Sequence, residues 1–274
     1  MGRSSMGGSW MGKSWTLCGT QCAVRVLGLA VVFCSASGRA TETAPVMELR
    51  PLPAGVTLPV QLGRTLRAGK VKTGTVIEAK TTQRVPVSAN EYLKPGVTVR
   101  GEVVASDAGD GTATHPSTLT IRFDQLSYRG QRVPLETRAI AIANIMDVDD
   151  TFSPTTGGAD RGNNSPSSWT TRQVGGDLVA RSGWVGPVVG AGLRTVGRAD
   201  FYGVYSLPVE LHGADSAMMP RAMGVFSTTA QGLYGYETGA RLESSGGLIT
   251  ITSQEKSAVI RNGDNLLLEV VAGR

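Results

Sequence analysis

Alternation of apolar and polar residues runs through the middle of this 274-residue chain and constrains its fold more than any other feature. Residues 97–104 place valines on one side of an extended backbone and mainly polar side chains on the other. Residues 118–126 repeat the pattern with larger apolar side chains. A period of two is typical of a half-buried strand. Because the segment 107–112 between them is rich in turn-forming residues, the two strands are predicted to pair as a hairpin.

The segment 56–149 as a whole predicts five or six antiparallel strands, each with one apolar face. Pro59 assigns the first of them to a sheet edge or a strand start, because proline cannot donate a backbone hydrogen bond. A second tight turn is expected at Arg129-Gly130. The apolar face needs a cover, so we expect an all-β fold, an antiparallel small barrel or sandwich with a Gly/Pro-rich irregular insert. Little helix is expected apart from the signal segment.

Residues 150–200 are predicted to be this insert, a Gly/Ser-rich linker without periodicity. Within it, residues 183–193 are apolar but rich in glycine. They predict an irregular loop packed on the barrel, with a short helix as the alternative, because glycine and proline disfavour helix.

Strand signals return in residues 201–274, which we expect to complete the same domain. The predicted strands are 204–211, 222–228, 247–253, 258–261 and 266–271. Asn262-Gly263-Asp264 predicts a hairpin turn between the last two, since Asn-Gly tolerates positive φ angles.

Residues 1–40 have the pattern of a secretory signal peptide. Arg25 precedes the uncharged apolar run 26–34, which is too short to span a bilayer, and small residues follow it. Cleavage after Ala36 or after Ala40 fits this pattern, and an uncleaved membrane anchor is the alternative.

Translation from Met11 instead of Met1 would give a leader of ordinary length. After the leader, residues 41–55 are expected to form a flexible Pro-rich segment.

Segment 1–40 also accounts for the basic character of the chain. The whole sequence has a net charge of +5 and three cysteines, and this segment holds all three cysteines, four basic residues and no acidic one. The remainder is therefore free of cysteine and has a net charge of +1. Such a chain suits an oxidising compartment, the periplasm or the exterior, and lacks the basic surface typical of nucleic-acid binding. No stable transmembrane span is expected after cleavage.

The sequence predicts no catalytic residue, cofactor site or metal site. His115 and His212 lack metal-ligand spacing, and no Gly-x-Ser-x-Gly motif is present. The acidic run 147–150 lacks the glycine and the final glutamate of a calcium loop, so it is interpreted as a solvated strand end. The glycines of 183–197 do not match a dinucleotide-binding motif.

Aromatic residues are the only candidates for ligand or partner contact. They are Trp169, Trp184, Tyr234 and Tyr236, of which the two tyrosines would share one face of a strand. Core packing is the alternative role for each of them.

Three runs resemble exported bacterial proteins of unknown function, and also the C-terminal β-barrel of the TrbI-type scaffold protein of conjugation and type IV secretion channels. They are Gly74-Thr-Val-Ile with Val85-Pro-Val, Leu93-Lys-Pro-Gly-Val-Thr-Val-Arg-Gly-Glu-Val, and Leu119-Thr-Ile-Arg-Phe-Asp-Gln-Leu with Gly130-Gln-Arg-Val-Pro-Leu. The resemblance covers roughly residues 58–135 and implies a β-barrel fold. The family's membrane helix, long Pro-rich stretch and two-helix extension have no counterpart here.

These observations favour a non-enzymatic protein of the cell envelope that acts through a protein partner and can form an oligomer. A module that binds carbohydrate or another small ligand through the aromatic residues is the first alternative. A secreted hydrolase, with a site assembled from distant Asp, Glu and Ser residues, is the second. A pair of carboxylates or a Ser-His pair in one pocket would contradict the non-enzymatic interpretation and favour the hydrolase.

Overall fold

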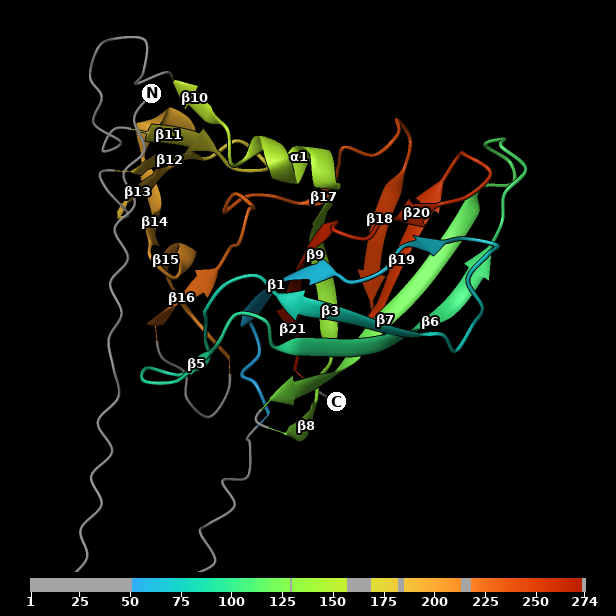
Figure 1. The fold of residues 1–274 in the computed structure, drawn as a ribbon, viewed down its shortest axis with the longest axis horizontal. Coiled ribbons are helices and arrows are strands. Elements are labelled where there is room, and N and C mark those ends of the chain that lie inside the picture. The colour runs from blue at the N-terminus through green and yellow to red at the C-terminus, as the bar shows by residue number, and fades with distance from the viewer. Residues whose placement is uncertain (1–50, 129, 157–168, 182–184, 213–217, 273–274) are drawn as a thin grey trace, which may run out of the picture. The chain divides into compact units, whose positions relative to one another are not determined.

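The computed structural model describes residues 51–128, 130–156, 169–181, 185–212 and 218–272 (Figure 1). Paired strands form the framework of this part of the chain. The predicted leader and Trp184 lie outside these residues. The expected all-β, antiparallel fold is confirmed. The described part contains one α-helix, α1 (Ile145–Asp150), and one short 3-10 turn, η3 (Ala191–Leu193).

The larger sheet has ten strands and curls into a nearly closed barrel (Figure 1). The two ends of the sheet approach each other, since the Ala139 amide of β9 (Thr137–Ala143), the strand next to the end strand β17 (Gly232–Tyr234), donates at 3.0 Å to Ser244 Oγ of the other end strand, β18 (Arg241–Ser245). All pairs are antiparallel except β17 with β9. In spatial order the strands are β17 (Gly232–Tyr234), β9 (Thr137–Ala143), β21 (Asn265–Val270), β1 (Thr57–Leu62), β3 (Val76–Thr81), β6 (Thr98–Asp107), β7 (Ser117–Tyr128), β19 (Leu248–Ser253) and β18 (Arg241–Ser245), with β8 (Gln131–Pro134) paired to β7.

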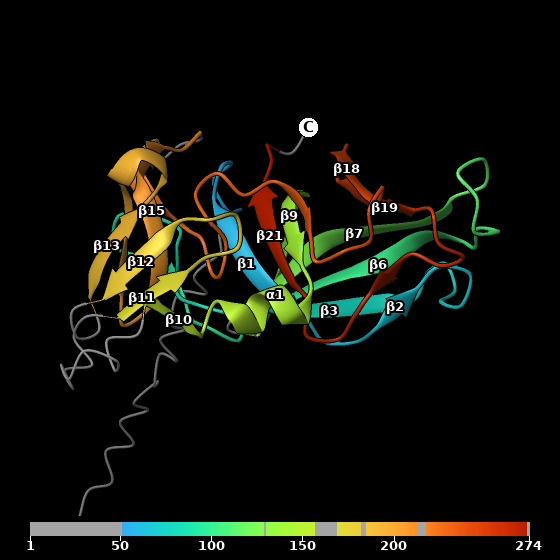
Figure 2. The same ribbon diagram turned by 90° about the horizontal axis from the view of Figure 1, so that it is seen from above.

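The predicted hairpin between 97–104 and 118–126 is confirmed by β6 and β7, which run side by side along the barrel wall (Figure 2). Val103 pairs with Ile121, and both are fully buried. The turn after β7 is also as predicted, because Tyr128 pairs with Gln131 and Gly130 has a φ of +77°. Alternating burial along these strands forms the barrel core.

Pro59 predicts a sheet edge or a strand start for residues 56–62. The edge is wrong, because β1 lies between β21 and β3, whereas Pro59 does lie at the start of the pairing with β3. Proline is tolerated at this position because the regular pairing of β1 with β3 covers only the residues after it. The register with β3 begins at Val60, and the Pro59 carbonyl still accepts from the Thr82 amide at 2.9 Å. The proline thus removes one donor at the last rung and leaves the pairing with β21 intact.

The hairpin predicted at Asn262-Gly263-Asp264 is also wrong. The turn exists, with Gly263 at a φ of +94°, but its backbone bonds to β1: the Gly263 amide donates to the Leu62 carbonyl, and the Leu62 amide to that of Asp264. The chain therefore crosses between sheets. The strand before the turn, β20 (Val259–Ile260), pairs with β2 (Leu66–Arg67), whereas β21 pairs with β1 and β9.

More than half of the described residues in 150–200 form strands, where the sequence predicts an irregular insert. They belong to a seven-stranded antiparallel sheet in which the strands follow chain order. These strands are β10 (Pro154–Thr156), β11 (Trp169–Arg172), β12 (Leu178–Arg181), β13 (Gly186–Val189), β14 (Thr195–Asp200), β15 (Gly203–Glu210) and β16 (Met218–Ala222). A separate two-stranded sheet, β4 (Val85–Pro86) with β5 (Tyr92–Leu93), lies next to β16.

Glycine in this sheet permits close packing of strands, which explains the wrong expectation. A Cβ at Gly197 in β14 would overlap the Tyr205 carbonyl of the neighbouring strand β15. The strand predicted at 222–228 is also wrong, since β16 lies before it and ends at Ala222.

Strands β9 and β21 are buried on both faces, and this double burial joins the two sheets. Ile142 and Leu268 belong to the barrel core, whereas Ala141 and Leu267 pack in a second core with Phe226 and residues of the seven-stranded sheet. Figure 2 shows that sheet, in yellow and orange, beside these strands. Burial on both faces accounts for the continuous apolar run in residues 266–268.

Replacement of Gly197 by alanine tests whether this segment is a strand. The expected loss in the free energy of unfolding is about 3 kcal/mol, because the new Cβ must displace the β15 backbone. Gly192→Ala is the matched control: its Cβ meets no atom within 4 Å, and only its φ of +70° is unfavourable, at about 1 kcal/mol. Urea denaturation measures both. Equal losses would contradict the strand assignment.

Candidate functional site

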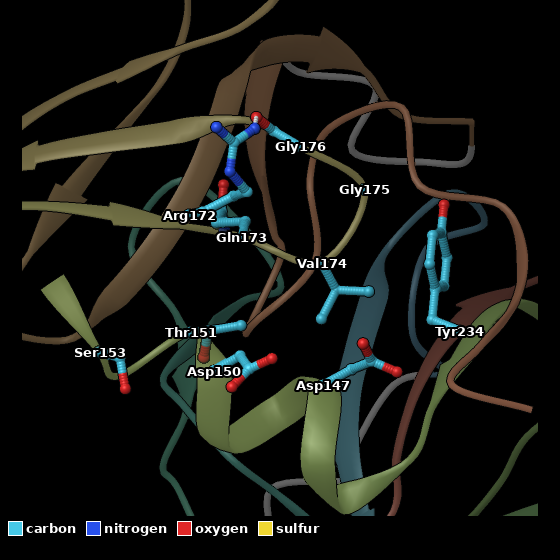
Figure 3. A pocket seen from close by; sticks show the side chains of 10 residues that line it. All are labelled: Asp147, Asp150, Thr151, Ser153, Arg172, Gln173, Val174, Gly175, Gly176 and Tyr234. Atoms are coloured by element: carbon cyan, nitrogen blue, oxygen red, sulfur yellow. Dashed lines mark hydrogen bonds between the residues drawn. The ribbon is translucent and has the colours of Figure 1, made fainter. Parts of the chain in front are cut away.

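A pocket of about 410 Å³ lies between α1 and the turn that joins β11 to β12 (Figure 3). One wall comes from α1 and the residues after it, namely Asp147, Asp150, Thr151 and Ser153. The other wall comes from residues 172–176, and Tyr234 of β17 stands at the side.

Helix α1 forms the first wall because both of its ends are capped. Asn144 is the N-cap, and its Oδ1 accepts from the Asp147 amide at 2.9 Å. The Ile145 amide donates to Asp264 Oδ1 at 3.0 Å, and Thr151 Oγ1 donates to the Val148 carbonyl at 2.7 Å. The strand end predicted for 147–150 is therefore wrong. Asn144 three residues before an aspartate was the signal that favoured a helix start.

The second wall is a turn held against residues 225–228. The Val174 amide donates to the Val225 carbonyl at 2.9 Å, and the Ser227 amide donates to the Val174 carbonyl at 2.7 Å. Asp177 Oδ2 accepts from the amide and hydroxyl of Thr228 at 2.8 and 2.9 Å. The pocket thus lies between two walls whose backbones are fixed by hydrogen bonds.

Asp147 is the residue that sets the chemistry of the pocket. Its Oδ2 atom is buried and has no hydrogen-bond partner among the described residues. Figure 3 shows its carboxyl directed towards Val174 and Tyr234. Burial, and secondly the negative charge of Asp150, raise the pKa of this carboxyl above its ordinary value of 3.8.

Gly235 makes room for this carboxyl. Its φ of +70° favours glycine, and any side chain there would collide with the Asp147 carboxyl and the Asn144 amide. Asn144 Nδ2 also donates to the Gly235 carbonyl. The glycine therefore brings the chain close to the helix start without filling the pocket.

The other polar groups leave the pocket with an excess of negative charge and of acceptors. Arg172 lies opposite Asp147 and Asp150 and donates to the Gly176 carbonyl at 3.4 Å (Figure 3). No ion pair within the described chain involves Arg172 or either aspartate. Gln173 is 4% exposed and donates to the Phe226 carbonyl at 2.9 Å, while its Oε1 has no partner among these residues.

The four aromatic candidates do not gather at one place. Tyr234 lines the pocket, and its hydroxyl accepts from the Gln231 amide at 3.1 Å. Tyr236 instead packs against the barrel core and donates to Asp264 Oδ2 at 2.9 Å, because Gly235 turns the chain between the two tyrosines. Trp169 lies in β11, but its side chain is outside the described part of the structure. Trp184 lies entirely outside that part.

No family model, curated protein or solved structure matches this chain. The resemblance to the TrbI-type barrel thus remains an expectation from the sequence. In the described ranges no helix is both long and apolar enough to cross a membrane. The same residues contain no cluster of three acidic, histidine or cysteine side chains that could hold a metal ion.

Substitution of Asp147 by asparagine should stabilise the fold more at pH 7 than at pH 4. The folded state holds a proton on this carboxyl more tightly than the unfolded state does. Stability from this group is therefore present at low pH and lost as the pH rises through the raised pKa. Asparagine cannot ionise and avoids that loss.

Denaturant titration at both pH values measures this effect. Asp149→Asn is the control, because it removes the same charge from an exposed position of the same helix outside the pocket. A larger gain at pH 4 than at pH 7 would refute the assignment.

Proposed function

We propose that this chain is an exported, non-enzymatic protein of the cell envelope that acts by binding a protein partner. In this proposal the pocket between α1 and residues 172–176, called the α1 pocket below, receives a basic side chain of the partner. The observation that carries it is the buried, unpaired Oδ2 of Asp147. A buried acceptor without a donor costs roughly 1–3 kcal/mol, and a partner that donates to it removes this cost.

A lysine or arginine side chain matches the pocket in charge and in shape. Both side chains carry only donors, whereas Asp147 and Gln173 each have a buried acceptor atom without a donor among the described residues. Two carboxylates outweigh the single guanidinium of Arg172. Val174 and Tyr234 offer an apolar wall for the aliphatic stem of such a side chain.

Apolar side chains exposed around α1 support a protein as the partner. Met146 and Phe152 are 69% and 71% exposed, and Ile145 is 38% exposed. These three residues belong to or directly follow α1, the element that forms one wall of the pocket, and exposed methionine and aromatic side chains are typical of protein interfaces.

Export is proposed on the sequence alone. The basic residue before the apolar run 26–34, the small residues after it and the absence of cysteine beyond residue 40 support it. The periplasm or the exterior follows as the proposed location.

A hydrolase is the second candidate function, favoured by two carboxylates in one pocket and by the raised pKa of Asp147. The paired carboxylates of glycosidases flank the scissile bond. Asp147 and Asp150 lie one turn apart on the same wall (Figure 3), which favours binding of a cation over catalysis. A sugar-binding face of Tyr234 with Tyr236 has less support, because the two side chains lie in different cores.

A short basic peptide tests the proposed function. We expect acetyl-Gly-Arg-Gly-amide to shift the backbone amide resonances of Asp147 and of residues 174–176 in the NMR spectrum. Asp147→Asn and Asp150→Asn should each weaken binding about tenfold, since a hydrogen bond to a charged group is lost. Added salt should also weaken it.

Two controls make this test selective. The peptide with citrulline, which is neutral but similar in shape, should bind much less, and Asp149→Asn should bind as the native protein does. Equal binding of the citrulline peptide would contradict the proposal. Hydrolysis of a model glycoside that is lost in Asp147→Asn would favour the hydrolase instead.

A further inference from the structure

A second cluster of polar and aromatic side chains lies away from the α1 pocket and shares no residue with it. The Arg84 guanidinium, just before β4, lies over two tyrosine rings. Its Cζ lies 3.7 Å from the ring centre of Tyr92 in β5 and 4.6 Å from that of Tyr202, between β14 and β15. We call these three residues the arginine clamp.

Backbone hydrogen bonds fix the clamp in place. The Arg84 amide donates to the Tyr202 carbonyl at 3.2 Å, and the Tyr205 hydroxyl donates to the Arg84 carbonyl at 2.8 Å. The Tyr202 amide donates to Asp200 Oδ1 at 2.7 Å. A guanidinium held in this way loses little further conformational freedom when it binds a ligand.

The in-plane edges of the guanidinium are unoccupied by any described residue. Its five N–H donors lie in its plane. The structure records no hydrogen bond or ion pair of these donors within the described ranges, although Asp200 and Glu91 lie nearby in sequence to the two rings. A planar carboxylate pairs with such an edge through two parallel hydrogen bonds.

Both rings of the clamp leave aromatic surface exposed next to this charge. Tyr202 is 55% exposed and Tyr92 37%. The weakly positive C–H groups of a sugar ring pack favourably on the negative face of an aromatic ring. Tyr202 is both exposed and in contact with the guanidinium, so a sugar ring that carries a carboxylate can contact both the charge and the aromatic surface.

We propose that the arginine clamp is a binding site for the carboxylate of an acidic sugar, a uronate, with the exposed ring of Tyr202 packing against the sugar ring. This site takes an anion, whereas the α1 pocket takes a cation. It therefore goes beyond the proposed function and does not depend on it.

Titration of the protein with trigalacturonate, followed by the side-chain Nε–H resonance of Arg84, tests this inference. We expect that resonance to shift with trigalacturonate and to stay unchanged with the neutral trisaccharide galactotriose. Arg84→Lys keeps the charge but lacks the planar pair of donors, and should weaken binding about tenfold. Arg64→Lys, at an exposed arginine outside the clamp, is the control and should bind normally.

A second variant keeps the test valid if Arg84→Lys unfolds. Tyr202→Leu removes a ring that is 55% exposed, and it should weaken trigalacturonate binding more than binding of acetate. Equal affinity for galactotriose, or no shift at Arg84, would overturn the proposal. So would equal or tighter binding of inorganic phosphate or of an acetylated glutamate peptide, which would assign the clamp to another anion.

Discussion

The buried carboxylate of Asp264 is the interaction on which the site depends. It is fully buried and accepts three hydrogen bonds, from the Ile145 amide at 3.0 Å, the Arg261 amide at 2.7 Å and the Tyr236 hydroxyl at 2.9 Å. One group thus fixes the start of α1, the turn before β21 and the chain after Gly235. Burial raises the pKa of Asp264, although these hydrogen bonds act in the opposite direction.

Asp264 and Asp147 differ in whether their buried carboxyl oxygens accept hydrogen bonds. The carboxylate of Asp264 has donors on both oxygens, so its burial is compensated and it holds three segments together. Asp147, two residues beyond Ile145, has a buried oxygen to which no residue of the described part donates. A group that destabilises the fold while lining a pocket is typical of a residue kept for binding or catalysis.

The sequence predicted those parts of the fold that depend on local alternation. The β6–β7 hairpin follows from valines and large apolar residues at every second position, and the barrel follows from the need to cover their face. Pro59 and the Asn262-Gly263 turn misled because their outcome depends on which distant strand lies beside them. Gly197 misled because glycine signals both a loop and a close strand contact. Tyr234 was predicted as a contact residue, but the pocket beside it needs Gly235 and Asp264, whose roles arise only from tertiary contacts.

The central claim is that the buried carboxyl of Asp147 binds a cationic donor from a partner. The pKa of this carboxyl tests the claim most directly. The ¹³Cγ resonance of Asp147 can be titrated against pH with and without the arginine peptide. The account predicts a pKa above the ordinary 3.8 in the free protein, and a marked fall when the peptide is bound, because a positive charge favours the carboxylate. An unchanged pKa, with the peptide bound at saturation, would contradict it.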